Sequence, residues 1–195
     1  MIGLRASGWE GIESLVFVRH AMPQVDALSP PGEWRLAPEG VRAARGVVLP
    51  VSASTRLLAS TEVKAIQTLS LITGSSETTI RCDAGFDEVQ RSEPVDAEYL
   101  DRRRAWVRGE PDARHEGWES FADVGARMDA AIIRLRADSM IIGTHGMALT
   151  AWLVRAGLVA PGAAAVGFWS SLAYPDVIEI TRRVGTGWRL MRTRR

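Results

Sequence analysis

The chain lacks three features that would place it in a specialised class of protein. It has one cysteine, Cys82, so no disulfide can form within the chain, and a reducing compartment is the simpler expectation. No run in its 195 residues approaches the ~18 apolar residues of a membrane-spanning helix. Its formal net charge of +1 gives no general attraction to nucleic acid or to an anionic membrane. We therefore expect a soluble cytoplasmic protein without nucleic-acid or membrane partners.

Lysine is nearly absent as well. Lys64 is the only lysine among 24 basic residues, and all the others are arginine. In a chain that otherwise uses arginine, this lysine could be chance drift on a helix surface. It could also lie where a compact, titratable ammonium matters. Composition leaves both interpretations open.

Two apolar segments each end in a histidine. Residues 14–18 are rich in β-branched and aromatic side chains and stop at Arg19-His20, and residues 139–143 stop at Thr144-His145. Such short runs are typical of buried strands. A single Arg-His pair would more often be the start of an ordinary loop. Two His-terminated strands, however, can bring both imidazoles to the sheet edge where open α/β sheets bind ligands.

Strands and helices alternate along the rest of the chain. Further strands are expected at 55–59, 78–82, 177–181 and 188–191. Helices are expected at 38–47, from Ser60 or Thr61 to Thr73, around 96–107, from the Ser120 cap to 137, and through Trp152 to Ala156. This alternation predicts one α/β domain over residues 1–195 with a mainly parallel sheet. The polar segment at about 83–117 is expected to be an inserted cap or lid.

Polar residues follow several of the predicted strands and offer imidazoles, cations and carboxyl groups. They are Arg19-His20, the helix start at Ser60–Lys64, Asp87-Glu88 and His145-Gly146. This set suits phosphoryl transfer. A histidine can be a covalent nucleophile, and fixed cations and helix N-termini stabilise the charge on the transferred group. A carboxylic acid can protonate the leaving oxygen.

In this order the segments resemble the histidine phosphatase superfamily, the phosphoglycerate-mutase-like family, from Val16 to about Thr181. The motifs are similar to the family's Arg-His-Gly, Leu-Thr-x-x-Gly, Ser-Pro-x-x-Arg-Ala-x-Gln-Thr, Leu-x-Glu and second-histidine motifs. They lie at Phe17–Ala21, Leu36–Gly40, Ala59–Thr68, Phe86–Glu88 and Ile142–Gly146. An Arg-His pair alone is a weak signal, but the full set in the right order is a strong one. The resemblance implies a three-layer sandwich with helices on both faces of the sheet.

The resemblance also implies roles for individual residues. His20 would attack phosphorus and become phosphohistidine, while Arg19 and His145 would hold the phosphoryl oxygens. Glu88 would protonate the leaving oxygen and then activate water. Its neighbour Asp87 is the alternative acid, although the spacing from the preceding phenylalanine favours Glu88.

The remaining expected phosphate ligands lie at the helix start, Ser60–Lys64. This segment also departs from the family pattern at two positions. Ser60 and Thr61 could direct backbone N–H groups at the phosphate, and Thr61 stands where proline is usual. Lys64 replaces the second phosphate-binding arginine, so the site keeps a charge and loses a planar two-donor fork. We expect Lys64 to bind phosphate, with weaker binding, a slower step or a shifted substrate preference. The alternative is that it points to solvent and leaves the site incomplete.

Together these features predict a metal-independent phosphomonoester phosphatase that needs no cofactor. Its substrate would be a small phosphorylated molecule or a phosphoprotein, selected by the insertion and the loop at 24–34, with Arg91 and Arg102–Arg104 as possible contacts. A mutase-type phosphotransferase is one alternative, although the chain looks short for it. A metal-assisted hydrolase with His20, Asp87 and His145 as ligands is another, and no closely spaced His or Cys pair supports it. A third is a catalytically weak module that binds phosphate or a partner. The sequence assigns no oligomeric state.

Overall fold

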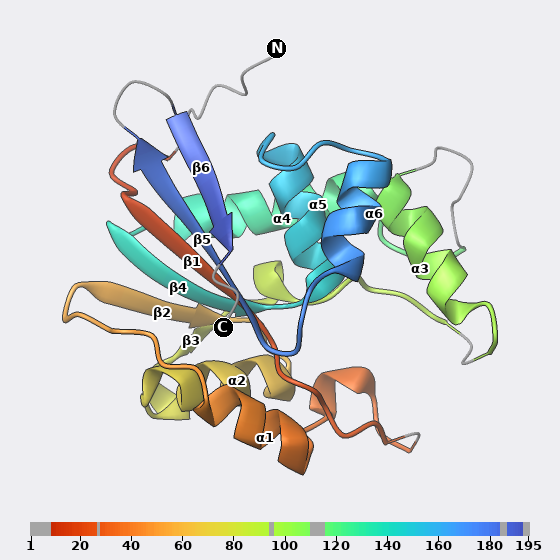
Figure 1. Cartoon of the computed structure of the whole chain (residues 1–195), viewed down its shortest axis with the longest axis horizontal. Helices are drawn as coiled ribbons and strands as arrows, with labels where there is room; N and C mark the ends of the chain where they lie inside the picture. Colours follow the sequence, from red (N-terminus) through yellow and green to blue (C-terminus); the bar gives the residue numbers. More distant parts are fainter. Residues whose placement is uncertain (1–8, 27, 94–95, 110–115, 184–186, 193–195) are drawn as a thin grey trace.

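The computed structural model describes residues 9–26, 28–93, 96–109, 116–183 and 187–192. Within these residues, six strands form one sheet in the order β3-β2-β4-β1-β5-β6 (Figure 1). The strands are β1 (Ser14–Arg19), β2 (Thr55–Ala59), β3 (Arg81–Cys82), β4 (Ser139–Thr144), β5 (Asp176–Arg183) and β6 (Gly187–Arg192). The pairs β3–β2, β2–β4 and β4–β1 are parallel, whereas β5 is antiparallel to both β1 and β6. The predicted α/β fold with a mainly parallel sheet is confirmed.

Helices cover both faces of this sheet, as Figure 1 shows. In the described part of the chain they are α1 (Pro38–Arg45), α2 (Val63–Thr73), α3 (Tyr99–Arg108), α4 (Phe121–Arg134), α5 (Gly146–Arg155) and α6 (Ala163–Ser170). Helices α1 and α2 lie on one face, and α4 and α5 lie on the other. The predicted three-layer arrangement is therefore confirmed.

The central strand β1 supplies side chains to both hydrophobic cores because successive residues point to opposite faces. Leu15 and Phe17 belong to the core under α4 and α5, and Val18 belongs to the core over α1 and α2. Phe17 packs on Trp152 with ring centroids 4.8 Å apart. A fully buried side chain of this size contributes about 1.5–3 kcal/mol. Burial on both faces explains why the strand reads as an unbroken apolar run.

Several element boundaries follow local signals in the sequence. Gly74 adopts φ 66°, a left-handed conformation that glycine permits, and it ends α2 as predicted. The Ser120 hydroxyl accepts a hydrogen bond from the backbone N–H of Asp123 and caps α4, which also confirms the prediction. Helix α4 ends at Arg134, earlier than the expected 137.

Two expectations were wrong in detail, and one helix was missed. Strand β3 covers only Arg81–Cys82, because residues Glu77–Thr79 form a 3-10 turn capped by Ser76. Helix α2 begins at Val63, with Glu62 in the N-cap position, rather than directly after Ser60 or Thr61. Helix α6 was not predicted at all.

Two family-like motifs hold the loop after β1 in place. A Cβ atom at position 40 would lie 2.2 Å from the Met22 carbonyl oxygen, so Gly40 permits the close approach of α1 to this loop. The Thr68 hydroxyl on α2 accepts a hydrogen bond from the Ala21 N–H (2.9 Å), and the Gln67 side-chain oxygen accepts one from the Leu36 N–H (3.0 Å). The Thr68 hydrogen bond fixes Ala21, which follows His20, and the other two contacts fix the loop beyond it.

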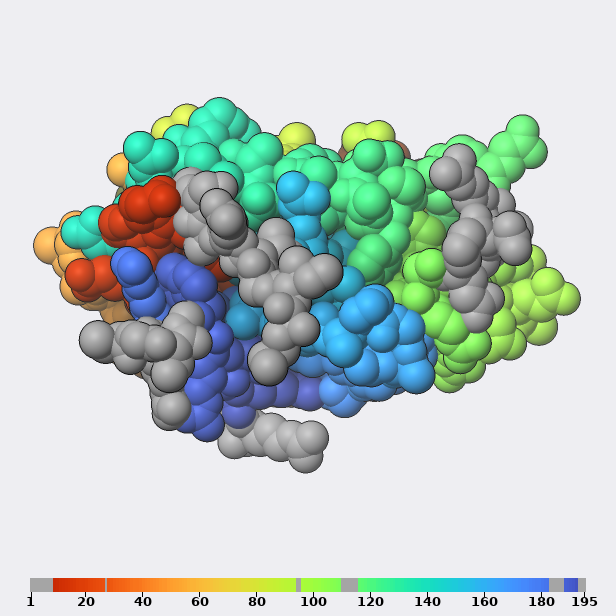
Figure 2. All heavy atoms as spheres, turned by 90° about the horizontal axis from the view of Figure 1, so that it is seen from above, coloured from red at the N-terminus to blue at the C-terminus, as the bar shows by residue number. Residues whose placement is uncertain are grey.

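The expected insertion packs away from β1. Its helix α3 contacts α5 and α6, and Trp106 and Val107 form a small core there with Val124 and Ala165. Figure 2 shows this green segment at the opposite end of the molecule from the red β1. The first part of the segment is not a cap, because Phe86 is fully buried in the main core. No helix among the described residues has the length and hydrophobicity to cross a membrane.

Candidate active site

The ends of β1 and β4 bring two histidines together. The two strands pair in parallel with Arg19 opposite Thr144, and the His20 N–H continues the ladder to the Thr144 carbonyl oxygen (3.0 Å). The next residues, His20 and His145, place their rings with centroids 5.1 Å apart. The prediction that both imidazoles reach one edge of the sheet is confirmed.

His20 is held as a neutral imidazole with one nitrogen available. Its Nδ1 lies 2.8 Å from the Ala21 carbonyl oxygen, so Nδ1 carries the proton and Nε2 keeps a lone pair. Burial, together with the nearby His145, holds the pKa of His20 well below its usual value. A neutral ring with a free Nε2 can act as a nucleophile at neutral pH.

The guanidinium of Arg19 is held in place by hydrogen bonds and a ring contact, yet one of its donors is not used by any residue that the structure describes. Its Nη1 donates to the Leu172 carbonyl oxygen (2.7 Å), and the Tyr174 ring covers the guanidinium at 3.6 Å. Its Nε is buried and has no hydrogen-bond partner among the described residues. A Cβ atom at position 146 would lie 3.1 Å from this Nε, so Gly146 leaves room for it. Arg19 therefore keeps a donor for an anion. Tyr174, whose ring also lies 5.4 Å from that of His20, was missed in the sequence because no motif marks it.

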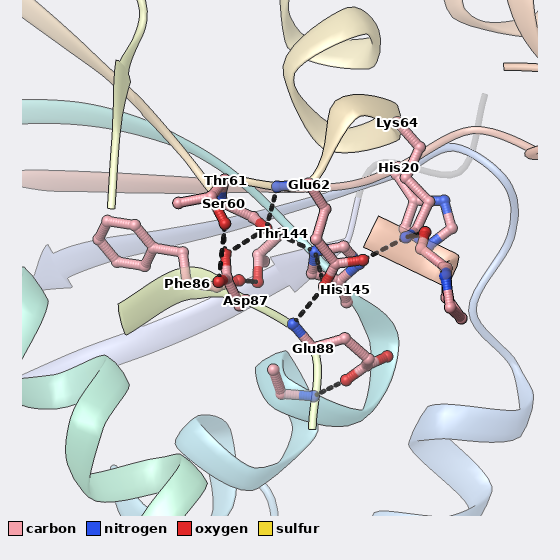
Figure 3. A network of polar contacts seen from close by, with 12 residues as sticks. His20, Ser60, Thr61, Glu62, Lys64, Phe86, Asp87, Glu88, Thr144 and His145 are labelled. Carbon is pink, nitrogen blue, oxygen red and sulfur yellow. Dashed lines mark hydrogen bonds and ion pairs between the residues drawn. The ribbon is translucent and has the colours of Figure 1, made fainter. Parts of the chain in front are cut away.

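His145 is completely buried, and its hydrogen bonds define its protonation. The Ser60 hydroxyl donates to Asp87 Oδ1 (2.7 Å), so the same oxygen accepts from His145 Nε2 at 2.8 Å (Figure 3). The Nδ1 atom has no partner among the described residues. Burial outweighs the attraction of Glu88 and lowers the pKa of His145 to about 3. His145 thus presents a bare Nδ1 acceptor in its neutral state and a second N–H once protonated.

The neighbouring acids Asp87 and Glu88 have different environments. Glu88 lies at the N-terminus of α5, where its Oε1 accepts hydrogen bonds from the N–H groups of Ala148 (3.0 Å) and Val89 (3.1 Å). Burial raises the pKa of Glu88, but His145 and Arg91, together with these N–H groups, hold it at about 2. Glu88 is therefore a carboxylate beside His145 at neutral pH.

Asp87 instead organises the start of α2. Its Oδ1 accepts from the Ser60 hydroxyl and from the Thr61 N–H (2.7 Å), and its Oδ2 accepts from the Thr61 hydroxyl (2.8 Å). These contacts hold Asp87 away from the histidines, so the geometry favours Glu88 over Asp87 as the acid.

The expected backbone cradle at Ser60 and Thr61 is not present. The Ser60 N–H donates to the Gly143 carbonyl oxygen (2.9 Å), and the Thr61 N–H donates to Asp87. Both N–H groups already have protein acceptors because the turn precedes α2 by two residues and is tied to β4. The Ser60 hydroxyl lies in the site, but its contacts position His145.

Lys64 is buried within the site, so the alternative that it points to solvent is wrong. Its Nζ donates to the Pro31 carbonyl oxygen (2.7 Å) and forms an ion pair with Glu62. Glu62 is a site residue that sequence reasoning missed. Its Oε1 accepts from the Glu88 N–H (2.8 Å) and lies 3.3 Å from His145 Nε2. The available signal was an acidic residue inside a phosphate-binding motif.

The other candidate arginines are paired within the insertion. Arg91 and Arg103 both bind the carboxylate of Glu93, at 3.1 and 2.8 Å. Arg102 pairs with Asp96 at 2.9 Å. These contacts order the insertion, and none of these pairs involves the histidines. Among the residues that the structure describes, no group of three or more His, Cys, Asp or Glu side chains could hold a metal ion.

Comparisons with known proteins agree with this geometry. The histidine phosphatase superfamily (branch 1) matches the chain over residues 15–179. A mycobacterial glucosyl-3-phosphoglycerate phosphatase has the same fold, with a TM-score of 0.60, 21% identity, and coverage of 92% of this chain and 96% of that chain. The complex of that enzyme with inorganic phosphate gives a TM-score of 0.61 at 19% identity, covering 93% of this chain and 96% of that chain.

A second structural neighbour is a putative alpha-ribazole-5'-P phosphatase from Escherichia coli K-12. Its TM-score is 0.63 at 16% identity, and the match covers 94% of this chain and 97% of that chain. No curated protein is similar enough in sequence to count as a relative. At these identities, the structural likeness shows the fold alone.

Proposed function

Because the chain belongs to the histidine phosphatase superfamily, we propose that it is a metal-independent phosphomonoester phosphatase that acts through a phosphohistidine at His20. The observation that carries this proposal is the pairing of the two imidazoles, whose ring centroids lie 5.1 Å apart, next to two buried nitrogens that no described residue hydrogen-bonds. Those nitrogens are Arg19 Nε and His145 Nδ1. Buried polar atoms are normally hydrogen-bonded. A phosphoryl oxygen could accept from Arg19 Nε, and a second phosphoryl oxygen could share a proton with His145 Nδ1.

In the first half of the proposed reaction, His20 Nε2 attacks phosphorus and the bond to the ester oxygen breaks. Arg19 would bind phosphoryl oxygens through the donors that Leu172 and Tyr174 leave open. His145 would bind another oxygen through Nδ1, with one proton held between them on either atom. Rigid donors that match the charge of the transition state need no reorganisation during the reaction.

The leaving oxygen needs a proton, and Glu88 is the acid within the site. Its low pKa of about 2 means that it holds no proton before the substrate arrives. A doubly charged phosphoryl group beside it raises that pKa, since like charges favour the protonated form. In the second half, Glu88 would take a proton from the water that attacks phosphohistidine, and inorganic phosphate would leave.

The structural neighbours support phosphate ester hydrolysis as the class of reaction. Two of them are phosphatases by name, and one has been solved with inorganic phosphate bound. For the present chain we propose a small phosphorylated substrate, with a phosphoprotein as the alternative, in the reducing compartment that the single cysteine favours.

The test is hydrolysis of a generic aryl phosphate by the wild-type protein and by His20→Ala, with folding of both checked by circular dichroism. We expect His20→Ala to lose activity by on the order of a thousandfold or more. We expect chelators to leave the wild-type activity unchanged. Loss of activity with a chelator and its return with added metal would show that the covalent-histidine mechanism is wrong.

One observation favours a second candidate function, a weak module that binds phosphorylated ligands without turnover. Lys64 stands in the second cation position and is already paired with Glu62. A single-turnover assay over a panel of phosphomonoesters separates the two functions. Binding of phosphate with no product release in any member of the panel would favour the binding module.

A further inference from the structure

Glu62 places a carboxylate among the groups proposed to bind phosphate. The side chain is largely buried, with 14% of its surface exposed. Its Oε2 pairs with Lys64, and its Oε1 accepts from the Glu88 N–H and faces His145 Nε2, as the network in Figure 3 shows. Contacts with three residues fix the position of this charge.

The carboxylates of the site cancel its cations. Arg19 and Lys64 provide two positive charges, and Glu62 and Glu88 provide two negative charges. The two histidines add none, because burial and neighbouring groups keep both neutral at neutral pH. A site with no net charge is poorly matched to a phosphoryl group that carries two negative charges. Removing Glu62 alone would leave one positive charge in excess.

The charged groups further from the histidines carry both signs, and most of them are held in ion pairs. Arg91 is paired with Glu93, and Arg127 on α4 is paired with Glu119 at 2.9 Å. Asp87 lies behind Ser60 and adds negative charge. Charged and titratable groups face the imidazole of His145 from every packed element. They are Arg19 at the end of β1, His20 after it, Glu62 and Lys64 at the start of α2, Asp87 behind Ser60, Glu88 and Arg91 of the following segment, and Arg127 of α4.

We propose that Glu62 is a positioning residue that makes the site accept the phosphoryl group only together with one proton. This inference rests on the proposed function of the site. The proton arrives on a monoanionic phosphoryl group, or it is taken up by His145 Nδ1 when a dianion binds; the two descriptions are the same complex with the proton on either side of one hydrogen bond.

The proton has a use in the reaction. When the bond between phosphorus and the ester oxygen breaks, the leaving oxygen needs one proton, and Glu88 holds none in the free protein. The proton that enters with the phosphoryl group meets this need, through Glu88 or directly. The balance is then complete without any group that the site lacks.

Inorganic phosphate is the probe, because its binding can be measured without turnover. Calorimetric titrations in two buffers of different ionisation enthalpy count the protons taken up with each phosphate. For the wild-type protein at alkaline pH we expect uptake of about one proton per phosphate, and affinity that falls about tenfold per pH unit. For Glu62→Gln we expect little proton uptake, and alkaline affinity higher by on the order of tenfold to a hundredfold.

The matched control is Glu39→Gln, which removes the same charge from an exposed position on α1. It should behave like the wild-type protein. Binding by the wild-type protein without proton uptake, or equal pH dependence in Glu62→Gln and wild type, would overturn this inference alone. Absence of phosphate binding at every pH would overturn the proposed function as well. The proton count of the wild-type protein needs no variant, so a folding defect in Glu62→Gln leaves the test intact.

Discussion

The two halves of the site are built differently. At the ends of β1 and β4, Arg19 Nε and His145 Nδ1 are buried and have no hydrogen-bond partner in the part of the chain that the structure describes. At the start of α2, the corresponding groups are occupied: the Ser60 hydroxyl binds Asp87, and Lys64 binds Glu62 and the Pro31 carbonyl oxygen. Under the proposed function, the strand ends would receive the phosphoryl charge, whereas residues at the helix start would position other side chains and neutralise charge. Substitutions at the strand ends should therefore reduce activity more than substitutions at the start of α2.

The largest effect in this comparison is expected for Glu88→Gln. The amide keeps the shape but can neither supply nor accept the proton, so kcat/KM should fall by about 10²–10⁴-fold. Because the pKa of Glu88 is about 2 in the free protein, the wild-type kcat/KM should show no titration of this group between mildly acidic and neutral pH. Asp87→Asn is the control. An equal loss of kcat/KM in that variant would contradict the assignment of the proton transfer to Glu88.

The next effect is expected for Arg19→Lys. The substitution keeps the charge but removes the guanidinium that Tyr174 and Leu172 orient, together with its unpartnered Nε. We expect a loss of roughly 10²-fold in kcat/KM, measured with an aryl phosphate. If kcat/KM fell less in Arg19→Lys than in the reciprocal variant Lys64→Arg, the helix start rather than the strand ends would be the half that binds the phosphoryl group.

Lys64→Arg should have a smaller effect. The new guanidinium can keep the ion pair with Glu62 and offers a second donor edge to the phosphoryl group. We expect phosphate to bind about two- to tenfold more tightly, as measured by competition with the aryl phosphate. Unchanged affinity and turnover would mean that the Lys64 ammonium does not contact phosphate.

The smallest effect on activity is expected for Asp87→Ala, which should act mainly on stability. The variant removes the acceptor of three hydrogen bonds from Ser60 and Thr61, so we expect the free energy of unfolding to fall by about 1–3 kcal/mol. Chemical denaturation measures this directly. A variant with full stability and strongly reduced turnover would place Asp87 in the reaction itself.

The strand-end half could be predicted from the sequence because its geometry follows from backbone rules. Two apolar runs that pair in parallel and in register must deliver the residues that follow them to the same edge, so His20 and His145 meet. The spacing from Phe86 also favoured Glu88 over Asp87 as the acid. Phe86 is anchored in the core, so its position fixes where each of the two following carboxylates lies.

The helix-start half could not be predicted, because it depends on side-chain partners across the fold. The position of α2 two residues further on, and the use of the Ser60 and Thr61 N–H groups by Gly143 and Asp87, are tertiary contacts. The role of Glu62 depends on three contacts from separate elements. Helix α6 was missed because Ala163–Ser170 has an almost uninterrupted small and apolar sequence without helical periodicity.

The central claim is that a phosphoryl group is transferred to His20. The most direct measurement is rapid mixing of the protein with an aryl phosphate, denaturation under alkaline conditions that preserve phosphohistidine, and mass spectrometry of the peptides. The account predicts one phosphoryl group on the peptide that contains His20, and none in His20→Ala. Turnover without any phosphorylated peptide, or a phosphoryl group on another residue, would contradict it.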